Sequence, residues 1–254
     1  MSDLPPPPPP HSIPPPGYVA YGGQGSVAQG TQKIAGLAKA LAVLLIIMVP
    51  FQVLGIFSTI TLTDKARELI DGSITESEFE DATQANLGSL AGLLIIPVAV
   101  LTMIWMFRMA SNLRALGRRG ATWAPGWGIG GWFVPPCVLY VVPWLMFKEL
   151  WRGSDPDCGY DDPNWKKGPV APIITIWWVL YGLLPLAGLA TSANTISQLT
   201  NAGDMETIAE QFDKFATFNI AMAVIGVGTT VVYFVLVRQL SARHMAATRE
   251  SASR

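Results

Sequence analysis

The chain has 254 residues, half of them hydrophobic and only 14% charged, and its formal net charge is −1. Its mean hydropathy is +0.37. A soluble globular domain carries about 25% charged residues, so this composition favours a protein that sits in a lipid bilayer. The near-neutral charge excludes bulk attraction to nucleic acid, and we expect no nucleic-acid partner. Two cysteines, Cys137 and Cys158, are too few for a disulfide framework.

Residues 1–32 are typical of a disordered Pro/Gly-rich tail. Pro5–Pro10 and Pro14–Pro16 supply nine of the 20 prolines, and glycine, serine and glutamine follow. Such a stretch favours extended polyproline II structure and has nothing with which to build a core. The motif Pro15-Pro16-Gly17-Tyr18 matches a ligand of WW-type domains, although the composition of a solvated tail explains it as well.

Four uncharged hydrophobic stretches are each long enough to cross a hydrocarbon core of ~30 Å as a helix. They cover about residues 40–62, 87–107, 170–190 and 218–237. We therefore expect an all-α integral membrane protein with four transmembrane helices. Its membrane domain would span residues 33–245, and residues 246–254 would form a short tail.

The distribution of positive charge predicts the orientation. With four spans, 14 of the 17 Lys and Arg residues fall on the side of the two chain ends and of residues 108–169, whereas the other side holds 11 of the 18 acids. A fifth span at 127–147 would remove most of this asymmetry. Because cytoplasmic loops carry the Lys/Arg excess, we expect a multi-pass protein of the plasma membrane with both termini in the cytoplasm.

Residues 123–152 form a Trp-rich segment broken by proline between the second and third spans. Pro135-Pro136 removes two amide donors and blocks a continuous helix. Broken backbone at membrane depth requires partners from protein or water. Tryptophan suits the headgroup level, where its N–H stays wet. The sequence predicts that this segment is re-entrant or interfacial, and leaves open which.

A short internal repeat accompanies this scheme. The sequences ESEFEDA at 76–82 and AEQFDKFA at 209–216 each lie between two hydrophobic stretches. Two copies of one helical hairpin would explain the match. Coincidence also explains a match this short.

A set of residues between Arg108 and Trp151 follows the order and spacing of a known family. The set comprises Arg108, Asn112–Gly117, Pro125-Gly126-Trp127, Gly131–Pro135, Pro143 and Lys148–Trp151. By these residues the chain resembles the domain of unknown function 4328 family of bacterial, mostly actinobacterial, membrane proteins. The resemblance extends over roughly residues 34–245. It implies a multi-span membrane protein and brings no activity with it.

The sequence predicts no catalytic, metal or cofactor site. His11 and His244 lack neighbours with metal-ligand spacing, and Cys137 lies between proline and valine as an apolar filler. The glycine-rich stretch 126–131 lacks the Lys-Ser/Thr ending of a phosphate loop. Nucleophilic catalysis needs a base beside the nucleophile, and no such pattern is present. We therefore expect a non-enzymatic protein.

The cations and tryptophans near the inner leaflet carry the functional hypothesis. Each cation there gains about 1 kcal/mol from anionic lipid, although topology determinants alone would look the same. We expect a basic, Trp-rich cytoplasmic face that docks anionic headgroups, a protein partner or a second copy of the chain. The docking candidates are Arg108, Asn112, Arg114, Arg118, Arg119, Trp127, Trp132, Trp144, Lys148, Glu149, Trp151 and Arg152.

The alternative function is a small transporter or channel gated by the re-entrant segment. It would place Thr229, Thr230 and Asn194 toward a pore. Transport usually requires ionisable groups at membrane depth, and none of the four hydrophobic stretches contains Asp, Glu, Lys, Arg or His.

Overall fold

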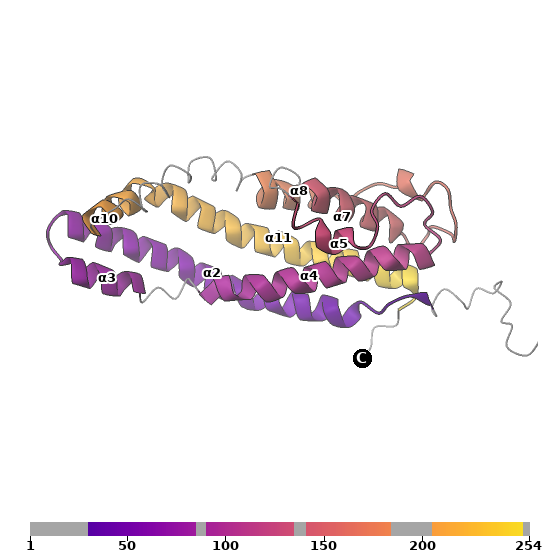
Figure 1. Ribbon diagram of the computed structural model, residues 1–254, viewed down its shortest axis with the longest axis horizontal. Helices are drawn as coiled ribbons and strands as arrows, with labels where there is room; N and C mark the ends of the chain where they lie inside the picture. Colours follow the sequence, from indigo (N-terminus) through magenta and orange to yellow (C-terminus); the bar gives the residue numbers. More distant parts are fainter. Residues whose placement is uncertain (1–29, 85–89, 135–140, 184–204, 251–254) are drawn as a thin grey trace, which may run out of the picture.

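The computed structural model describes residues 30–84, 90–134, 141–183 and 205–250. Within these ranges the chain forms helices and loops, arranged as one elongated bundle (Figure 1). The helices are α2 (Ala35–Ile70), α3 (Glu76–Gln84), α4 (Leu90–Ala115), α5 (Trp127–Gly130), α7 (Val141–Gly153), the 3-10 turn η2 (Trp165–Lys167), α8 (Pro172–Trp178), the π-helical η3 (Val179–Leu183), α10 (Met205–Lys214) and α11 (Ala216–Thr248). The expectation of an all-α protein is confirmed for the described chain.

Three of these helices are long and apolar enough to cross a membrane: α2, α4 from Gly92 onward, and α11. They contain the expected spans at 40–62 and 218–237 and the described part of the one at 87–107. The protein is therefore a helical chain with several membrane-type segments.

The expected span at 170–190 is only partly described. The chain there forms an apolar helix over Pro172–Leu183, which at 1.5 Å per residue is ~18 Å long and too short for a core of ~30 Å. Residues 184–190 lie outside the described chain. The described residues therefore provide three candidate spans where the sequence predicts four.

Three helices extend further than the hydrophobic stretches that predicted them, and α4 does so by eight residues, from 107 to Ala115. Helix α2 has 36 residues and continues to Ile70 through a charged last section, in which Lys65 pairs with Glu68 and Arg67 with Asp213. Helix α11 runs on to Thr248, so the tail expected at 246–254 begins inside a helix. The expected spans end where the first charged residues occur, because they were defined by the absence of charge. A helix can continue into water beyond that point when its charged side chains form pairs.

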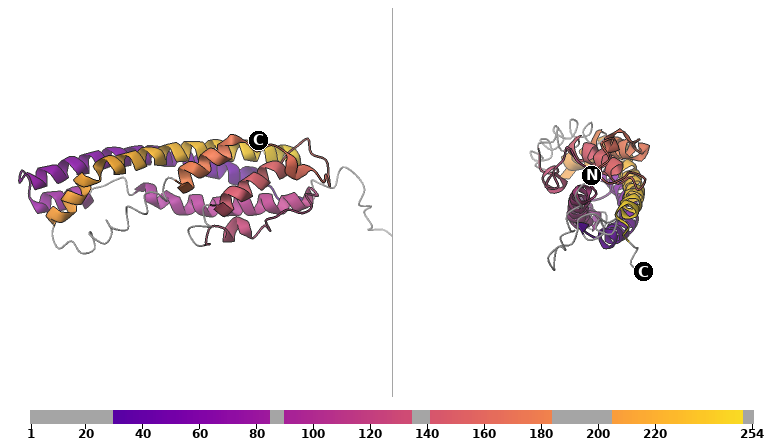
Figure 2. Two further views of the ribbon diagram at one scale, coloured as in Figure 1. Left: turned by 90° about the horizontal axis from the view of Figure 1, so that it is seen from above. Right: turned by 90° about the vertical axis from the view of Figure 1, so that its right-hand side faces the viewer.

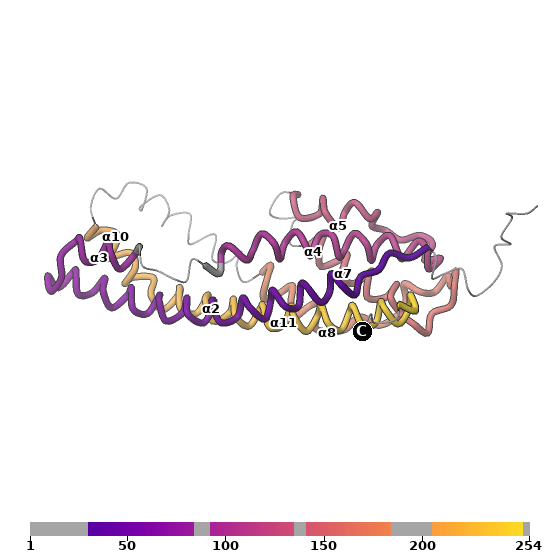
Figure 3. The backbone as a smooth tube through the Cα atoms, turned by 90° about the horizontal axis from the view of Figure 1, so that it is seen from below, coloured from indigo at the N-terminus to yellow at the C-terminus, as the bar shows by residue number. Residues whose placement is uncertain are grey.

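The far section of α2 packs against α3 and α10 at the end of the bundle opposite the chain termini (Figures 1 and 3). Ala66, Phe79 and Ala209 are fully buried in a small separate core. The Phe79 and Phe212 rings meet edge to face, with centroids 6.3 Å apart. These two phenylalanines occupy matching positions of the short internal repeat.

The main core joins α2, α4, α7, α8 and α11 and lies in the half of the bundle nearer the termini, where α7 and α8 pack beside the long helices (Figure 2). Trp105, Phe147 and Leu236 are fully buried there. Lipid is as apolar as these side chains, so close packing and interhelical hydrogen bonds hold such helices together rather than exclusion of water.

Candidate functional site: the basic end of the bundle

Charge is divided between the two ends of the molecule. We call the end that carries both chain termini the basic end; it consists of residues 30–39, 108–126, 148–170 and 238–250 (Figure 1). It holds 13 Lys and Arg side chains and six carboxylates. The acidic end, residues 63–84 and 205–217, holds ten carboxylates and three Lys or Arg side chains. All twelve docking candidates belong to the basic end or to the segment that leads into it from residue 123.

Helix α4 ends at the basic end in a turn that requires glycine. Gly117 has φ +70°, and the amide of Arg118 donates to the carbonyl of Leu113, which is the hydrogen bond of a Schellman ending. A Cβ on Gly117 would lie 2.8 Å from the backbone nitrogen of Asp161. The glycine thus both ends the helix and lets the loop after α7 close over it.

Arg118 is a buried structural residue at this turn, with 3% of its surface exposed. Its guanidinium donates to four backbone carbonyls of the loop that follows α7, those of Gly153, Asp155, Cys158 and Gly159. A guanidinium has five N–H donors in a fixed fork, so one side chain can satisfy a whole turn of backbone. Arg118 therefore shapes the basic end and does not face a docking partner.

Arg108 and Asn112 bind the backbone just before α2. The Arg108 guanidinium donates to the carbonyl of Lys33 at 2.9 Å. The Asn112 carboxamide accepts from the Gln32 amide at 2.7 Å and donates to the Gln32 carbonyl at 2.9 Å. These contacts fix the point at which the N-terminal tail joins the bundle.

The start of α2 is also bound by a residue close to the C-terminus. The Glu250 carboxylate accepts from the amides of Ile34 and Ala35, at 3.0–3.1 Å, at the start of α2. Amides in the first turn of a helix lack intrahelical partners, and the helix dipole favours a negative charge there. Glu250 therefore caps α2, and the two ends of the bundle domain are joined.

A buried polar network links Asn112, His244 and Ser154. Asn112 Nδ2 lies 2.9 Å from His244 Nε2, and His244 Nδ1 lies 2.7 Å from Ser154 Oγ. All three residues are at most 1% exposed. The Gln32 amide can only donate, so it fixes the orientation of the Asn112 carboxamide.

This orientation determines the imidazole tautomer. With its oxygen toward Gln32, Asn112 presents an N–H to His244 Nε2, which must accept, and Nδ1–H then donates to Ser154 Oγ. The Ser154 hydroxyl oxygen therefore accepts a hydrogen bond from the imidazole, and the imidazole does not act as a base toward it. The Asn112–His244–Ser154 network is thus structural. In an activated nucleophile the serine would donate to the imidazole, which is the opposite direction.

Sequence reasoning missed His244, Ser154 and Glu250. Ser241, His244 and Thr248 follow spacings of three and four on α11, which places them on one helix face. That polar stripe could have been recognised if the helix had been expected to continue past Val237. Ser241 on this stripe accepts from the indole N–H of Trp105 at 3.1 Å.

Glu149 joins the two ends of the Trp-rich segment. Its carboxylate accepts from the amides of Thr122 and Trp123, at 2.8 and 3.0 Å, so the chain before the segment lies beside the helix that ends it. Between them, Gly128 rests on α4, where a Cβ would approach the Phe107 nitrogen to 2.7 Å. Residues 135–140 lie outside the described chain.

The tryptophans of the segment make close aromatic contacts. Trp144 stacks on Trp178 with centroids 4.3 Å apart, and the Lys148 ammonium lies 3.7 Å from the Trp144 ring centre. The Arg243 guanidinium lies 5.2 Å from the Trp151 ring. Trp132 packs edge to face on Tyr181. The indole N–H groups of Trp132 and Trp144 are buried and have no hydrogen-bond partner among the described residues. They are therefore shielded from water, whereas the sequence predicts hydrated indoles at the headgroup level.

The remaining cations divide into paired and unpaired side chains. Arg119 pairs with Asp161 at 2.7 Å, and the Arg152 guanidinium donates to the Gly168 carbonyl. In the part of the chain that the structure describes, Arg108, Arg114, Lys148 and Arg152 have no carboxylate within ion-pair distance. Arg114 is exposed, and Lys148 is half-buried.

Groups suited to metal binding or thiol chemistry are scarce here. Across the described ranges, no cluster of three or more His, Cys, Asp or Glu residues could hold a metal ion. Burial raises the pKa of the Cys158 thiol, which donates to Asp162 at 3.4 Å. The thiol is therefore protonated near neutral pH and a poor nucleophile. Cys137 lies outside the described chain.

Comparison with known proteins identifies the family. No curated protein and no solved structure matches the chain significantly. The model of the family described as a domain of unknown function (DUF4328) matches residues 70–242, which is more than half of the chain. The match excludes most of α2 as well as His244 and Glu250. The chain belongs to the domain of unknown function 4328 family.

Proposed function

We propose that this chain is a non-enzymatic plasma-membrane protein whose basic end faces the cytoplasm and docks on anionic lipid headgroups of the inner leaflet. The observation that supports the proposal is that most carboxylates at this end have partners, whereas several Lys and Arg side chains have no carboxylate partner. Four of its six acids, Glu149, Asp155, Asp161 and Glu250, are bound by amides or arginines. Arg108, Arg114, Lys148 and Arg152 on the same end have no carboxylate partner within the described chain. Anionic lipid would supply the missing negative charge.

The path of the Trp-rich segment supports the re-entrant form of the proposal. Thr122 and Trp123 lie at the Glu149 carboxylate, so the segment leaves and returns at one end of the bundle. Gly128 contacts α4 at Phe107, eight residues and thus ~12 Å before the helix ends at Ala115. We propose that the segment dips into the inner leaflet to about this depth and does not cross.

Arg114 and the segment form the proposed docking surface. Arg114 follows Phe107 by seven residues, almost two helical turns, so both lie on the side of α4 that α5 covers. Trp127, Ile129 and Phe133 are 41%, 41% and 74% exposed on that side. Apolar side chains beside an unpaired cation are the composition of an interfacial lipid anchor. Lys148 on the Trp144 ring extends the charge to α7.

The test compares retention of phosphatidylglycerol and phosphatidylcholine on the purified full-length chain by native mass spectrometry. The double variant Arg114→Gln with Lys148→Gln should weaken phosphatidylglycerol binding about fivefold per residue, because each contact is worth about 1 kcal/mol. Phosphatidylcholine binding should not change. Arg119→Gln is the control for each single replacement, since it removes one positive charge from an arginine that already has a partner.

Equal effects of the control and the double variant, or no preference for phosphatidylglycerol in the wild-type chain, would refute lipid docking. Loss of a co-purifying protein in the double variant, with lipid retention unchanged, would assign the surface to a protein partner or a second copy instead.

A second candidate function is a small transporter or channel. Thr229 and Thr230 line a cavity between the helices, which is the observation in its favour. Both hydroxyls donate to carbonyls of their own helix, at 2.8 and 3.1 Å, so neither has a proton free for a permeating solute. Asn194 lies outside the described chain. Solute flux into liposomes that contain the purified chain would support this candidate.

A further inference from the structure

A cavity of about 420 Å³ lies between α2, α4, η3 and α11. Small-molecule sites in proteins measure roughly 300–1,000 Å³, so the volume is sufficient for a ligand. Most of its wall is apolar, with side chains such as Met48, Val98, Leu180 and Ile225. The cavity shares neither Arg114 nor Lys148 with the docking surface described above, and Trp132 is the residue of the Trp-rich segment that lines it.

Two polar groups of the wall have buried atoms without partners. Gln52 Oε1 and Trp132 Nε1 are both shielded, and neither has a hydrogen-bond partner among the residues that the structure describes. A buried polar atom without a partner costs about 1–3 kcal/mol. Gln52 lies 12 residues after Ala40 and ten before Leu62, which is ~15–18 Å from either end of the uncharged stretch. Bulk water therefore does not solvate this carboxamide in a membrane.

Four hydroxyl groups of the wall, those of Thr102, Thr229, Thr230 and Tyr233, have already donated their protons. Thr229 and Thr230 donate to Ile225 and Gly226. Thr102 donates to the Val98 carbonyl at 2.7 Å, so the contact of 2.7 Å between Thr102 and Tyr233 has the tyrosine as donor. Their oxygens remain available as acceptors only. Among the lining residues of the described chain, none carries a charge at neutral pH.

We infer that this cavity binds an uncharged lipidic alcohol. Its hydroxyl would donate to the Gln52 carboxamide and accept from the Trp132 indole, and its hydrocarbon chain would lie along the apolar wall. A hydroxyl is both donor and acceptor, so it suits a wall that offers an unpaired carboxamide oxygen and an unpaired indole N–H. A carboxylate or ammonium headgroup would lose its hydration without gaining an opposite charge.

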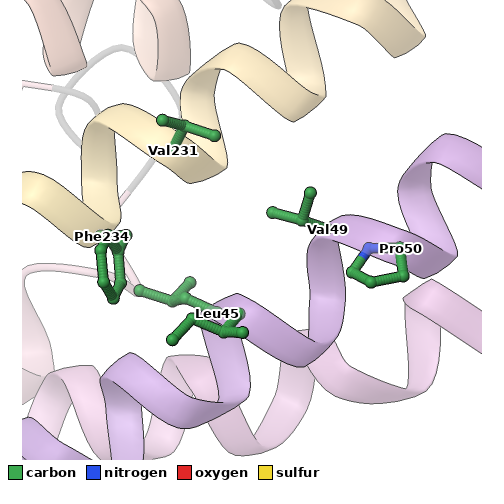
Figure 4. Close-up of a pocket in the computed structure, with 6 residues that line it drawn as sticks. Leu45, Val49, Pro50, Val231 and Phe234 are labelled. Atoms are coloured by element: carbon green, nitrogen blue, oxygen red, sulfur yellow. The ribbon is translucent and has the colours of Figure 1, made fainter.

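A second, apolar space opens beside this cavity on the surface of the candidate spans. A groove of about 320 Å³ between α2 and α11 is lined by Leu45, Ile46, Val49, Pro50, Val231 and Phe234 (Figure 4). Leu45 is 2% exposed and lines both the groove and the cavity. The Leu45 side chain therefore contacts both spaces, and a lipidic ligand that enters by the groove would reach the cavity from the side without passing through water.

The experiment uses the full chain in phosphatidylcholine nanodiscs and a diazirine-bearing hexadecanol as the photoreactive probe. We expect saturable labelling of α2, α4 or α11 at residues of the cavity, located by peptide mass spectrometry. Unlabelled hexadecanol should compete at least tenfold better than hexadecane, which lacks the hydroxyl, or hexadecanoate, which is charged. Equal competition by all three, or labelling spread over the outer surfaces of the helices, would overturn the inference.

Two variants test the site itself. Ala99→Phe fills the cavity and should abolish saturable labelling, whereas Val100→Phe, at a neighbouring position that is 47% exposed and does not line the cavity, should leave it unchanged. Gln52→Leu should remove the preference for hexadecanol over hexadecane, about a tenfold loss. It should also hold or raise the unfolding temperature without probe, because it removes an unpaired polar atom. Equal labelling of Ala99→Phe and Val100→Phe would refute the site. If Ala99→Phe fails to fold, the competition series on the wild-type chain decides.

Discussion

The two adjacent arginines at the end of α4 provide a controlled comparison, because one is buried and the other exposed. Arg118→Gln removes the donors to four carbonyls of the loop after α7. Hydrogen bonds from a charged group contribute about 1.5–3 kcal/mol each, but the amide of glutamine and entering water replace some of them. We expect a net loss of about 3–5 kcal/mol in the free energy of unfolding, the range found when a buried charged contact is broken.

Arg119→Gln is the control at the next position. Its side chain is 83% exposed and pairs with Asp161, and a surface ion pair contributes about 0–1 kcal/mol. Tryptophan fluorescence during heating of the detergent-purified chain should show that the unfolding temperature falls by roughly 6–20 °C for Arg118→Gln and by less than about 4 °C for Arg119→Gln. Similar shifts in the two variants would refute the structural role assigned to Arg118.

Three further predictions concern the basic end. Gly117→Ala should lower the free energy of unfolding by about 1–3 kcal/mol, since alanine must adopt φ +70° and would clash with the Asp161 backbone. The control Gly36→Ala, at a position on α2 with open space around it, should leave the free energy of unfolding unchanged or raise it. Because burial raises the pKa of Cys158, its alkylation by N-ethylmaleimide should still accelerate above pH 9. A rate that levels off near pH 8 would contradict this. Asn112→Leu should free the Gln32 backbone and speed tryptic cleavage after Lys33 about tenfold, whereas Ser111→Ala, whose hydroxyl bonds only its own helix, should not.

The sequence predicted the helical class and the position of the apolar helices, because runs without charge over 20 residues have few other structures available. It did not predict where α2 and α11 end. Helix α2 continues past Leu62 because its charges pair along and across helices, and α11 continues past Val237 because its polar face is buried. Hydropathy measures composition and is insensitive to both effects.

The site was predicted in outline and not in detail. Counting Lys and Arg identified the residues of the basic end, but it cannot distinguish Arg118, which is buried on carbonyls, from exposed Arg114. The Asn112–His244–Ser154 network joins residues up to 132 positions apart, and nothing local in the sequence pairs them. Gln52 lies within an uncharged stretch of the sequence, but its place in the cavity wall depends on how four elements assemble.

The central claim is that the basic end lies in the cytoplasm and the acidic end outside. Single cysteines at Thr122 of the basic end and Ser73 of the acidic end, both exposed, test it directly in a chain whose two native cysteines are serine. A maleimide that cannot cross the bilayer should label Ser73→Cys on intact cells, and should label Thr122→Cys only after lysis. Labelling of Thr122→Cys from outside intact cells would contradict the orientation and the docking of the basic end on the inner leaflet.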